Sequence, residues 1–369
     1  MQVVLAEKLS HLDGARWDAL TRDSGVFLQR PFLSALETAA PANVSPRYAL
    51  LFDGDEAIAA LVMQLVRIEG RSALAHAPIA HFVDERALVL GNLAAWGATG
   101  VATASPLRVL PEALKLVDRL RRFEKADGVV NMALVKDVAP ELDELSLRKA
   151  GYQRAPSGVD MQLRREPEWT SLDGYLSSLA AKRRRAVKKT IEEVEAAGYC
   201  VRRLTLEDVQ REEARLDSLY GQVWANADVR PLKLSGRFFV ELQRRLGDAC
   251  VITALEKNGR IDGFAVSLKN GDDCVGYYLG YEKSVEAPLY LRLLLAMLER
   301  AFDWRSSRLS LGRTCEDTKA RLGAVPVSTQ LWLKHRAPPM NWAVGAVLGT
   351  LHDPSIPTHR VFREVTPEV

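Results

Sequence analysis

The chain has 369 residues, of which 47% are hydrophobic, 26% charged and 7% aromatic, a profile that excludes collagen-like, disordered and disulfide-dense proteins. Fifty basic and 47 acidic residues leave a net charge of +3, too small for bulk electrostatic binding of nucleic acid or membrane, so any anionic partner must meet a local patch. A chain of this length is expected to hold two domains.

Hydrophobic spacing and turn residues predict the elements of the first half of the chain. In order, they are a strand (1–9), two helices (13–23, 31–39), three strands (48–52, 57–68, 71–77), an irregular stretch (84–109), a helix (111–125), a strand (129–135), a helix (140–150) and a strand (159–164). A long basic helix is predicted next, over residues 172–197.

The second half repeats this order of elements. It comprises a strand (199–205), two helices (206–224, 236–246), three strands (250–256, 261–268, 274–281), a helix (288–304), a strand (308–312), a helix (316–322) and a strand (327–334). Asn-Gly pairs at 258–259 and 270–271 indicate hairpin turns. The helix over 288–304 is apolar nearly all round and is therefore expected to be buried.

The repeated order predicts an internal duplication, most plainly where SLRKAGYQ in the first half matches TKARLGAV in the second. The alternative is one large mixed sheet with a coincidental order. The duplication implies four parts: an N-terminal domain (1–165), a basic linker helix (166–198), a C-terminal domain (199–336) and a proline-rich tail (337–369).

This arrangement resembles the GNAT superfamily of N-acyltransferases. The tandem copy is similar to the branch that holds the Fem-type peptidoglycan aminoacyltransferases and the BioF2-like acetyltransferases. The resemblance is carried by residues 31–37, 175–204, 277–303 and 311–326. It implies an α/β fold with mixed sheets, two tandem GNAT-like domains joined by the basic helix, and a reactive groove opened by splayed strands ahead of Pro288.

The resemblance also implies the reaction. An acyl group would pass from a thioester of coenzyme A or an acyl carrier protein to an amine in the interdomain cleft, with acyl-CoA as co-substrate and no tightly bound cofactor. The acceptor would be a small molecule or a lipid amine, such as a sphingoid-like long-chain base. One alternative is a Fem-type ligase that depends on aminoacyl-tRNA, and another is a non-catalytic binding module. DNA is not an expected partner.

The donor site departs from the superfamily pattern. Most members place a glycine-rich turn before the buried helix to hold the coenzyme A pyrophosphate, but here that turn reads EKSVEA over 282–287. Backbone N–H groups at 288–291 and the helix dipole could still attract anionic oxygens. The residues expected to bind the donor are Tyr281, Lys283, Ser284, Pro288, Leu289, Arg313 and Lys319.

Attack on a thioester requires a neutral amine, because a free alkylamine is almost fully protonated at neutral pH. Glu282, at the end of the strand over 274–281, is the predicted base, and the alternative is a solvated turn carboxylate paired with Lys283. Tyr278 and Tyr281 lie at odd spacing and should point to opposite faces. Either could protonate the leaving thiolate, with Tyr278 the predicted donor, although core aromatic residues are the commoner explanation.

The segment VWANADVRP supplies Trp224, Asn226 and Arg230 as candidate acceptor-binding residues, and an ordinary helix end is the alternative. His76 and His81 could line the cleft or be hydrogen-bonded structural histidines. Neither has a Glu or Cys at ligand spacing, so no metal site is predicted.

The predicted basic helix carries Lys182, Arg183, Arg184, Arg185, Lys188 and Lys189. They form either a phosphate-binding patch, for a nucleotide, carrier protein, transfer RNA or anionic membrane, or a solvated face paired with the glutamates that follow. The apolar patch at 342–351 is expected to dock on its domain, with a lipid surface as the alternative.

Four scattered cysteines favour a reducing compartment and argue against a disulfide framework. Residues 1–9 lack the features of a secretory signal, and no apolar run approaches the roughly 20 residues that span a bilayer. We therefore expect a cytoplasmic protein, with peripheral contact at the inner membrane as a further option.

Overall fold

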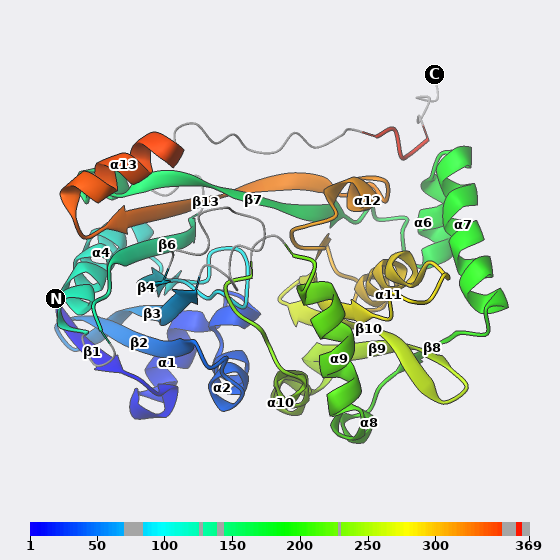
Figure 1. Ribbon diagram of the computed structural model, residues 1–369, viewed down its shortest axis with the longest axis horizontal. Helices are drawn as coiled ribbons and strands as arrows, with labels where there is room; N and C mark the ends of the chain where they lie inside the picture. Colours follow the sequence, from blue (N-terminus) through cyan, green and yellow to red (C-terminus); the bar gives the residue numbers. More distant parts are fainter. Residues whose placement is uncertain (70–83, 125–127, 139–143, 228–229, 349–358, 364–369) are drawn as a thin grey trace. The chain divides into compact units, whose positions relative to one another are not determined.

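The computed structural model describes residues 1–69, 84–124, 128–138, 144–227, 230–348 and 359–363 (Figure 1). The chain forms two compact units that are not consecutive stretches of sequence. The first unit consists of Met1–Gly158, Ala227–Phe238 and Ser328–Pro354. The second consists of Val159–Asn226, Phe239–Val327 and Ser355–Val369.

The first unit is built on a mixed sheet in the order β1-β2-β3-β4-β6-β13, in which only β4 and β6 run parallel. Its strands are β1 (Gln2–Ala6), β2 (Val44–Asp53), β3 (Glu56–Glu69), β4 (Asp84–Leu90), β6 (Met132–Val138) and β13 (Val325–His335), with the short β5 (Val101–Ala102) on β3. Its α-helices are α1 (Gly14–Thr21), α2 (Arg30–Thr38), α4 (Pro106–Phe123), α5 (Glu144–Lys149) and α13 (Pro338–Leu348).

The second unit repeats this topology in the order β8-β9-β10-β11-β12-β7, in which only β11 and β12 run parallel. Its strands are β8 (Cys200–Arg203), β9 (Cys250–Lys257), β10 (Arg260–Asn270), β11 (Asp273–Tyr281), β12 (Arg308–Ser310) and β7 (Gln153–Arg164). Its α-helices are α6 (Leu172–Ser178), α7 (Ala181–Ala196), α8 (Leu206–Arg211), α9 (Glu213–Trp224), α10 (Gly236–Leu246), α11 (Leu289–Asp303) and α12 (Glu316–Ala320).

The strand that closes each unit's sheet comes from the other half of the sequence. β7 follows the elements of the first unit along the chain but pairs with β12, and β13 follows those of the second unit but pairs with β6. The two units repeat one strand order, with the parallel pair at the same place in each, as the predicted duplication requires. The predicted α/β fold of tandem GNAT-like type is confirmed.

Some of the predicted elements differ in the structure. The third strand of the first meander is β4, at Asp84–Leu90, where the sequence predicted irregular chain, and the strand predicted over 71–77 lies outside the described residues. β4 escaped detection because its first half is charged and only residues 87–90 are buried. The single helix predicted over 172–197 is two helices, interrupted at Leu179 and Ala180, both of which have extended backbone.

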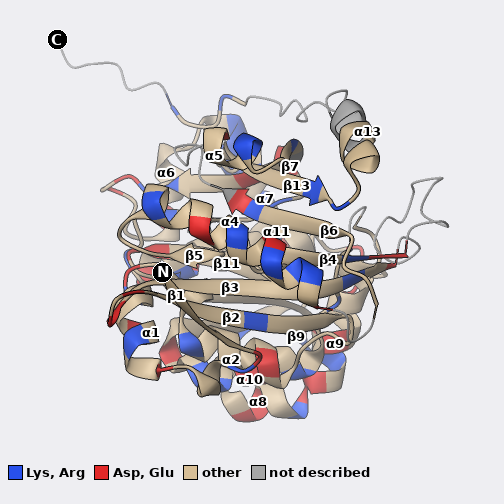
Figure 2. Cartoon of the chain, turned by 90° about the vertical axis from the view of Figure 1, so that its left-hand side faces the viewer, with Lys and Arg blue, Asp and Glu red and all other residues tan. Residues whose placement is uncertain are grey.

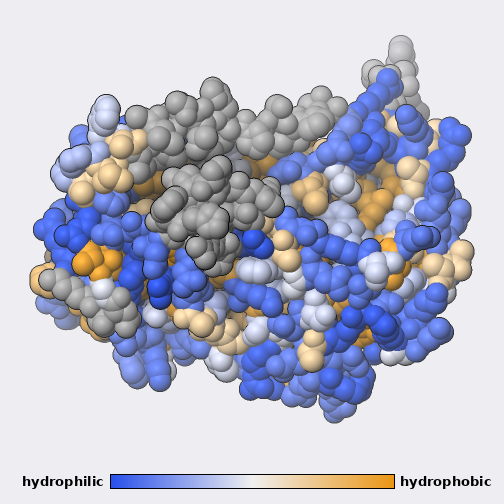
Figure 3. All heavy atoms as spheres, in the orientation of Figure 1, coloured by the Kyte–Doolittle hydropathy of each residue, from blue (hydrophilic) through white to orange (hydrophobic). Residues whose placement is uncertain are grey.

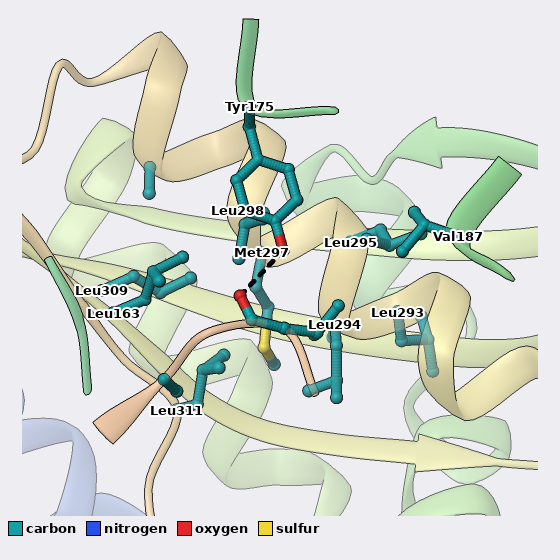
Figure 4. Packing of buried hydrophobic residues seen from close by; sticks show 14 of the residues in the cluster. Leu163, Tyr175, Val187, Leu293, Leu294, Leu295, Met297, Leu298, Leu309 and Leu311 are labelled. Atoms are coloured by element: carbon teal, nitrogen blue, oxygen red, sulfur yellow. Dashed lines mark hydrogen bonds between the residues drawn. The ribbon is translucent and has the colours of Figure 1, made fainter. Parts of the chain in front are cut away.

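The core of the second unit surrounds α11, which is buried on most of its circumference as its sequence predicted. Figure 4 shows Leu293, Leu294, Leu295 and Leu298 of this helix packed among side chains from other elements. Each buried leucine contributes about 1.5–3 kcal/mol of burial free energy, which fixes α11 against the sheet. A separate core in the first unit packs α4 against the sheet around Trp332.

Charged residues of both signs cover the surface. Figure 2 shows Lys and Arg interleaved with Asp and Glu on α4, and Figure 3 shows a mostly hydrophilic face on which apolar residues form small separate groups. None of the described helices combines the length and apolar character that crossing a membrane would require.

Candidate active site of the second unit

The candidate site begins where β11 and β12 separate. The two strands pair in parallel only from Asp273–Val275 to Arg308–Ser310. Beyond this point β11 continues to Tyr281 with β10 as its partner, whereas the chain after β12 bonds to β7 through Leu311 N and Met161 O. The strand separation predicted ahead of Pro288 is therefore confirmed.

A strained turn follows β12 at this point. Gly312, Thr314 and Cys315 all have positive φ, at 69°, 72° and 51°. Non-glycine residues in this region each cost about 1–3 kcal/mol, and such strain is concentrated at functional sites. The turn bends the backbone back so that the carbonyls of Gly312 and Arg313 face Lys319 of α12.

Lys319 is the central cation of the site. Its side chain is buried, with 3% of the residue exposed, and Nζ donates to Gly312 O at 3.1 Å and Arg313 O at 2.8 Å. Burial lowers the pKa of Lys319 to about 8, against the raising influence of Cys315, Glu316 and Asp160. An ammonium has three donors, and the two carbonyls take two of them, so one N–H remains for a ligand oxygen.

Asp160 of β7 fixes this turn through hydrogen bonds. Its carboxylate accepts hydrogen bonds from Ser310 Oγ at 2.7 Å, Gln162 Nε2 at 2.7 Å and Gly312 N at 3.0 Å. Burial raises the pKa of Asp160, although these hydrogen bonds and the charge of Lys319 oppose the increase. A buried carboxylate thus fixes the backbone that holds the ammonium.

Two tyrosines and a thiol gather beside Lys319. The rings of Tyr281, at the end of β11, and Tyr290, in the first turn of α11, lie 5.8 Å apart. Tyr290 lies in hydrogen-bond range of the Cys315 side chain, and burial is the main cause that raises its pKa. The hydroxyl groups of this cluster are therefore neutral donors at physiological pH.

The N-terminus of α11 offers fewer anion-binding groups than the sequence suggested. Pro288 has no N–H, and Leu289 N donates to Ala287 O at 2.7 Å, so neither of these predicted donor-binding residues supplies a free backbone group. Among the described residues, only the N–H groups of Tyr290 and Leu291 remain without a hydrogen-bond partner in this first turn. This corrects the expectation of free N–H groups throughout 288–291.

Glu282 is held in a network of cations. Its carboxylate accepts from both terminal nitrogens of Arg215 at 3.2 Å and from Ser284 Oγ at 3.0 Å. Burial acts to raise the pKa of Glu282, but hydrogen bonds from Gln222, Ser284 and Arg215 lower it overall. A general base at neutral pH needs a raised pKa, so this environment favours an anchoring role over the predicted base. Lys283 N is bonded to Gln222 Oε1, so the turn is tied to α9.

Tyr278 lies on the opposite side of β11 from the lysine cluster. Its ring contacts Tyr220 of α9 at a centroid distance of 5.5 Å, whereas Tyr281 faces Tyr290 of α11. The predicted opposite orientation of Tyr278 and Tyr281 is confirmed. Burial is the first cause that raises the pKa of Tyr278, and the charge of Arg313 opposes it.

The predicted acceptor-binding residues are not brought together within one unit. Trp224 ends α9 and Asn226 follows it in the second unit, whereas Arg230 belongs to the first unit. His76 and His81 lie outside the described residues. Sequence reasoning missed Asp160, Tyr290 and Cys315. A lone carboxylate between Val159 and Met161 was the available signal for Asp160, but its partners Ser310 and Gly312 are 150 and 152 residues away along the chain.

Comparisons with known proteins place the chain in a family and agree with its fold. Residues 116–348 match the model of the FemAB-like family, described as peptidoglycan biosynthesis/recognition. The chain belongs to the FemAB-like family. The family description covers both biosynthesis and recognition of peptidoglycan. No curated protein matches the chain.

Solved structures share the fold at low sequence identity. FemX is 10% identical with a TM-score of 0.59, over 94% of this chain and 100% of that one. A tandem GNAT protein from the clavulanic acid biosynthesis pathway is 11% identical with a TM-score of 0.52, over 91% and 99%. L-PGS from Bacillus licheniformis is 14% identical with a TM-score of 0.51, over 91% and 97%. At these identities the likeness concerns the fold alone.

Proposed function

We propose that this FemAB-like protein is an aminoacyltransferase that joins the acyl group of an activated aminoacyl ester to an amine, and that the second unit performs the chemistry. The observation that carries the proposal is the buried ammonium of Lys319, with an N–H donor to spare, at the point where β11 and β12 separate. Amide formation develops negative charge on the carbonyl oxygen, and a preorganised donor in a dry site stabilises such charge.

The step balances without a cofactor. The amine nitrogen forms a bond to the ester carbonyl carbon, the bond from that carbon to the ester oxygen breaks, and the proton lost by the amine ends on the leaving hydroxyl group. Lys319 donates a hydrogen bond to the carbonyl oxygen as it becomes an oxyanion. The rings of Tyr290 and Tyr281 lie 5.8 Å apart and would form an aromatic wall of this site.

The ester donor is favoured by what surrounds the N-terminus of α11. A coenzyme A pyrophosphate needs several backbone N–H groups, whereas the described first turn of α11 offers only those of Tyr290 and Leu291. Glu286 also adds negative charge to the preceding turn. The family description, peptidoglycan biosynthesis/recognition, supports a peptidoglycan-related amine as the acceptor. A cytoplasmic location is part of the same proposal.

A second candidate is transfer from an acyl-CoA or acyl carrier protein to a small or lipid amine. The observation in its favour is the pair of free N–H groups at Tyr290 and Leu291, at the start of a 15-residue helix whose dipole attracts anions. Under this candidate Lys319 would polarise a thioester carbonyl in the same way.

Donor competition distinguishes the two candidates. The purified chain is incubated with aminoacyl-tRNA or with acyl-CoA of several chain lengths, each with an amine-bearing peptidoglycan precursor peptide or a long-chain base, and amide products are identified by mass spectrometry. We expect product from aminoacyl-tRNA and the peptide. Product from acyl-CoA alone would replace the proposal with the second candidate.

Lys319→Met tests the mechanism, and Lys269→Met, which removes an exposed lysine from β10 of the same unit, is its control. Removing one oxyanion donor should lower turnover by about a hundredfold or more, while the control stays close to wild type. An unimpaired Lys319→Met enzyme would remove Lys319 from the mechanism. The absence of product with every donor would leave a binding module that has lost its chemistry.

A further inference from the structure

Residues 359–363, named here the C-terminal strap, lie against the junction of α6 and α7. Ala180 N donates to Val361 O at 2.9 Å, Arg363 N donates to Ser178 O at 2.9 Å, and Phe362 forms an antiparallel bridge with Leu179. Figure 1 draws the strap as the short red segment shortly before the C-terminus. The strap is thus a fixed part of the second unit.

The ring of Phe362 packs directly against the backbone of Gly323, in the turn that follows α12. A Cβ added to Gly323 would come within 2.3 Å of Phe362 Cζ, and Gly323 has a φ of +89°. On its other side the ring packs on Trp169 at 5.0 Å and Tyr175 at 6.4 Å. Only glycine fits at position 323, because both the conformation and the ring exclude a side chain.

A second contact joins the strap to the start of α12. His359 Nε2 lies 2.7 Å from Asp317 Oδ1, and Arg321 pairs with the same carboxylate at 2.8 Å. The hydrogen bond from His359 is the main cause that lowers the pKa of Asp317. Burial opposes this effect, and the charge and hydrogen bond of Arg321 lower the pKa further. The strap therefore contacts α12 at both ends.

Lys319 lies between these two contacts. A helix of five residues cannot hold its own position in water, so external contacts must set it. Tyr175 supplies one of them, because its hydroxyl donates to Leu322 O at 2.8 Å, a bond dashed in Figure 4. Phe362 packs on the ring that makes this bond, and so connects the strap to both sides of the lysine turn.

We propose that the C-terminal strap positions Lys319, with Phe362 and His359 as positioning residues that hold α12 and keep the ammonium on the carbonyls of Gly312 and Arg313. The consequence for turnover rests on the proposed function of Lys319, but the positioning itself does not. If the strap is released, α12 moves outward and water reaches the ammonium, while Asp160, Cys315 and Glu316 remain the charged or titratable groups around it.

The direct test measures the titration of Lys319 by NMR of the lysine side chains, with its signal assigned through its loss in Lys319→Met. Hydration should move the midpoint upward from about 8 toward the ordinary value of lysine. We expect a rise of about one pH unit in Phe362→Ala and a smaller rise in His359→Ala. His359→Gln keeps a donor for Asp317 and should restore the wild-type midpoint.

Val187→Ala is the matched control, because Val187 is buried in the same core but lies on α7, away from α12. It should lower the melting temperature without moving the Lys319 titration. An unchanged midpoint in both strap variants would overturn the positioning role, even if activity fell. A shifted midpoint combined with full activity of Lys319→Met would leave the positioning role intact and refute the proposed function instead.

Discussion

At the residue scale, the proposed chemistry depends on Lys319, whose two hydrogen bonds only partly replace the hydration that burial removes. Lys319 gives up hydration and receives two carbonyl acceptors in return, and its pKa falls to about 8 as a result. The residue therefore carries its charge at neutral pH but sits close to losing it. Such tuning is typical of catalytic groups and uncommon for structural lysines.

This pKa predicts an alkaline limit to activity. If the ammonium stabilises the oxyanion, kcat/KM should fall as pH rises through about 8, because the neutral amine cannot supply the same charge. A pH profile between about 6 and 9.5 measures this limb. Lys319→Arg should move the limb out of this range at a lower rate, and a wild-type profile that is flat above pH 8 would contradict the assignment.

The same pKa has a consequence for stability, with the sign set by linkage. The folded pKa of Lys319 lies below its unfolded value, so the unfolded chain binds more protons between about pH 8 and 10.5. Below pH 8 the buried lysine is charged, and its lost hydration lowers the free energy of unfolding by the full amount. This loss of stability decreases as the pH rises and the lysine becomes neutral. At pH 7 the free energy of unfolding of Lys319→Met should therefore be at least that of wild type. The difference between the two free energies should shrink by pH 10.

Glu282→Gln distinguishes an anchoring carboxylate from a base. Removing its charge weakens the pairing of Arg215, which is also bound to Asp262 at 2.7 Å. We expect a loss of about 1–3 kcal/mol in stability, because Arg215 is mostly buried. Turnover of the folded enzyme should change only severalfold, as measured beside the melting temperature. A hundredfold fall in kcat with unchanged stability would restore Glu282 as the base.

At the scale of elements, α7 brings four of its six cations to the solvent side. Lys182, Arg185, Lys188 and Lys189 are exposed, while Val187, Thr190 and Val194 are buried. Lys189 pairs with Glu193 at 3.5 Å, a surface contact worth about 0.3–0.5 kcal/mol. Lys188 has no ion-pair partner in the described part of the chain. This face is therefore available to a polyanion.

Lys188→Glu combined with Lys189→Glu tests this face. Because both residues are exposed, the melting temperature should change little, whereas affinity for transfer RNA should fall and its dependence on salt should become shallower. Filter binding at two salt concentrations measures both quantities. If the variant and wild type bind transfer RNA with equal affinity at low salt, α7 is only a solvated surface helix.

At the scale of the whole molecule, neither half of the sequence contains a complete sheet. β13 covers β6, with Trp332 fully buried against the first core, and β7 supplies Asp160 to the second unit. A chain cut between the halves would leave apolar sheet edges, which pair with other chains. The sheet of each unit is therefore completed by a strand from the other half of the sequence.

Fragments test this dependence. Residues 1–164 expressed alone should aggregate or stay unfolded, because β6 then lacks its partner, whereas coexpression with residues 165–369 should give a soluble complex. Gel filtration and amide hydrogen exchange report the outcome. A monomeric, protected fragment of residues 1–164 would show that β13 is dispensable for the first unit.

The sequence by itself determined the elements and their repeated order. Hydrophobic spacing located α10 and α11, and Asn-Gly turns located the hairpins of β9, β10 and β11, because these signals are local in the chain. The same reasoning named Lys319 as a donor-binding residue and Glu282 as the base, and both roles stay predictions. It had no means to see that Arg215 holds this carboxylate across 67 residues.

Only the tertiary structure decided which strand closes each sheet, which carboxylate supports the lysine turn and what holds α12 in place. These contacts join Asp160 to Ser310 and Phe362 to Gly323, and they depend on burial and on close approach of backbone rather than on any periodic pattern. Burial also sets the ionisation of Lys319, since desolvation is a property of the folded surroundings. The sequence specifies which groups can titrate, whereas the fold sets the pH at which each of them does so.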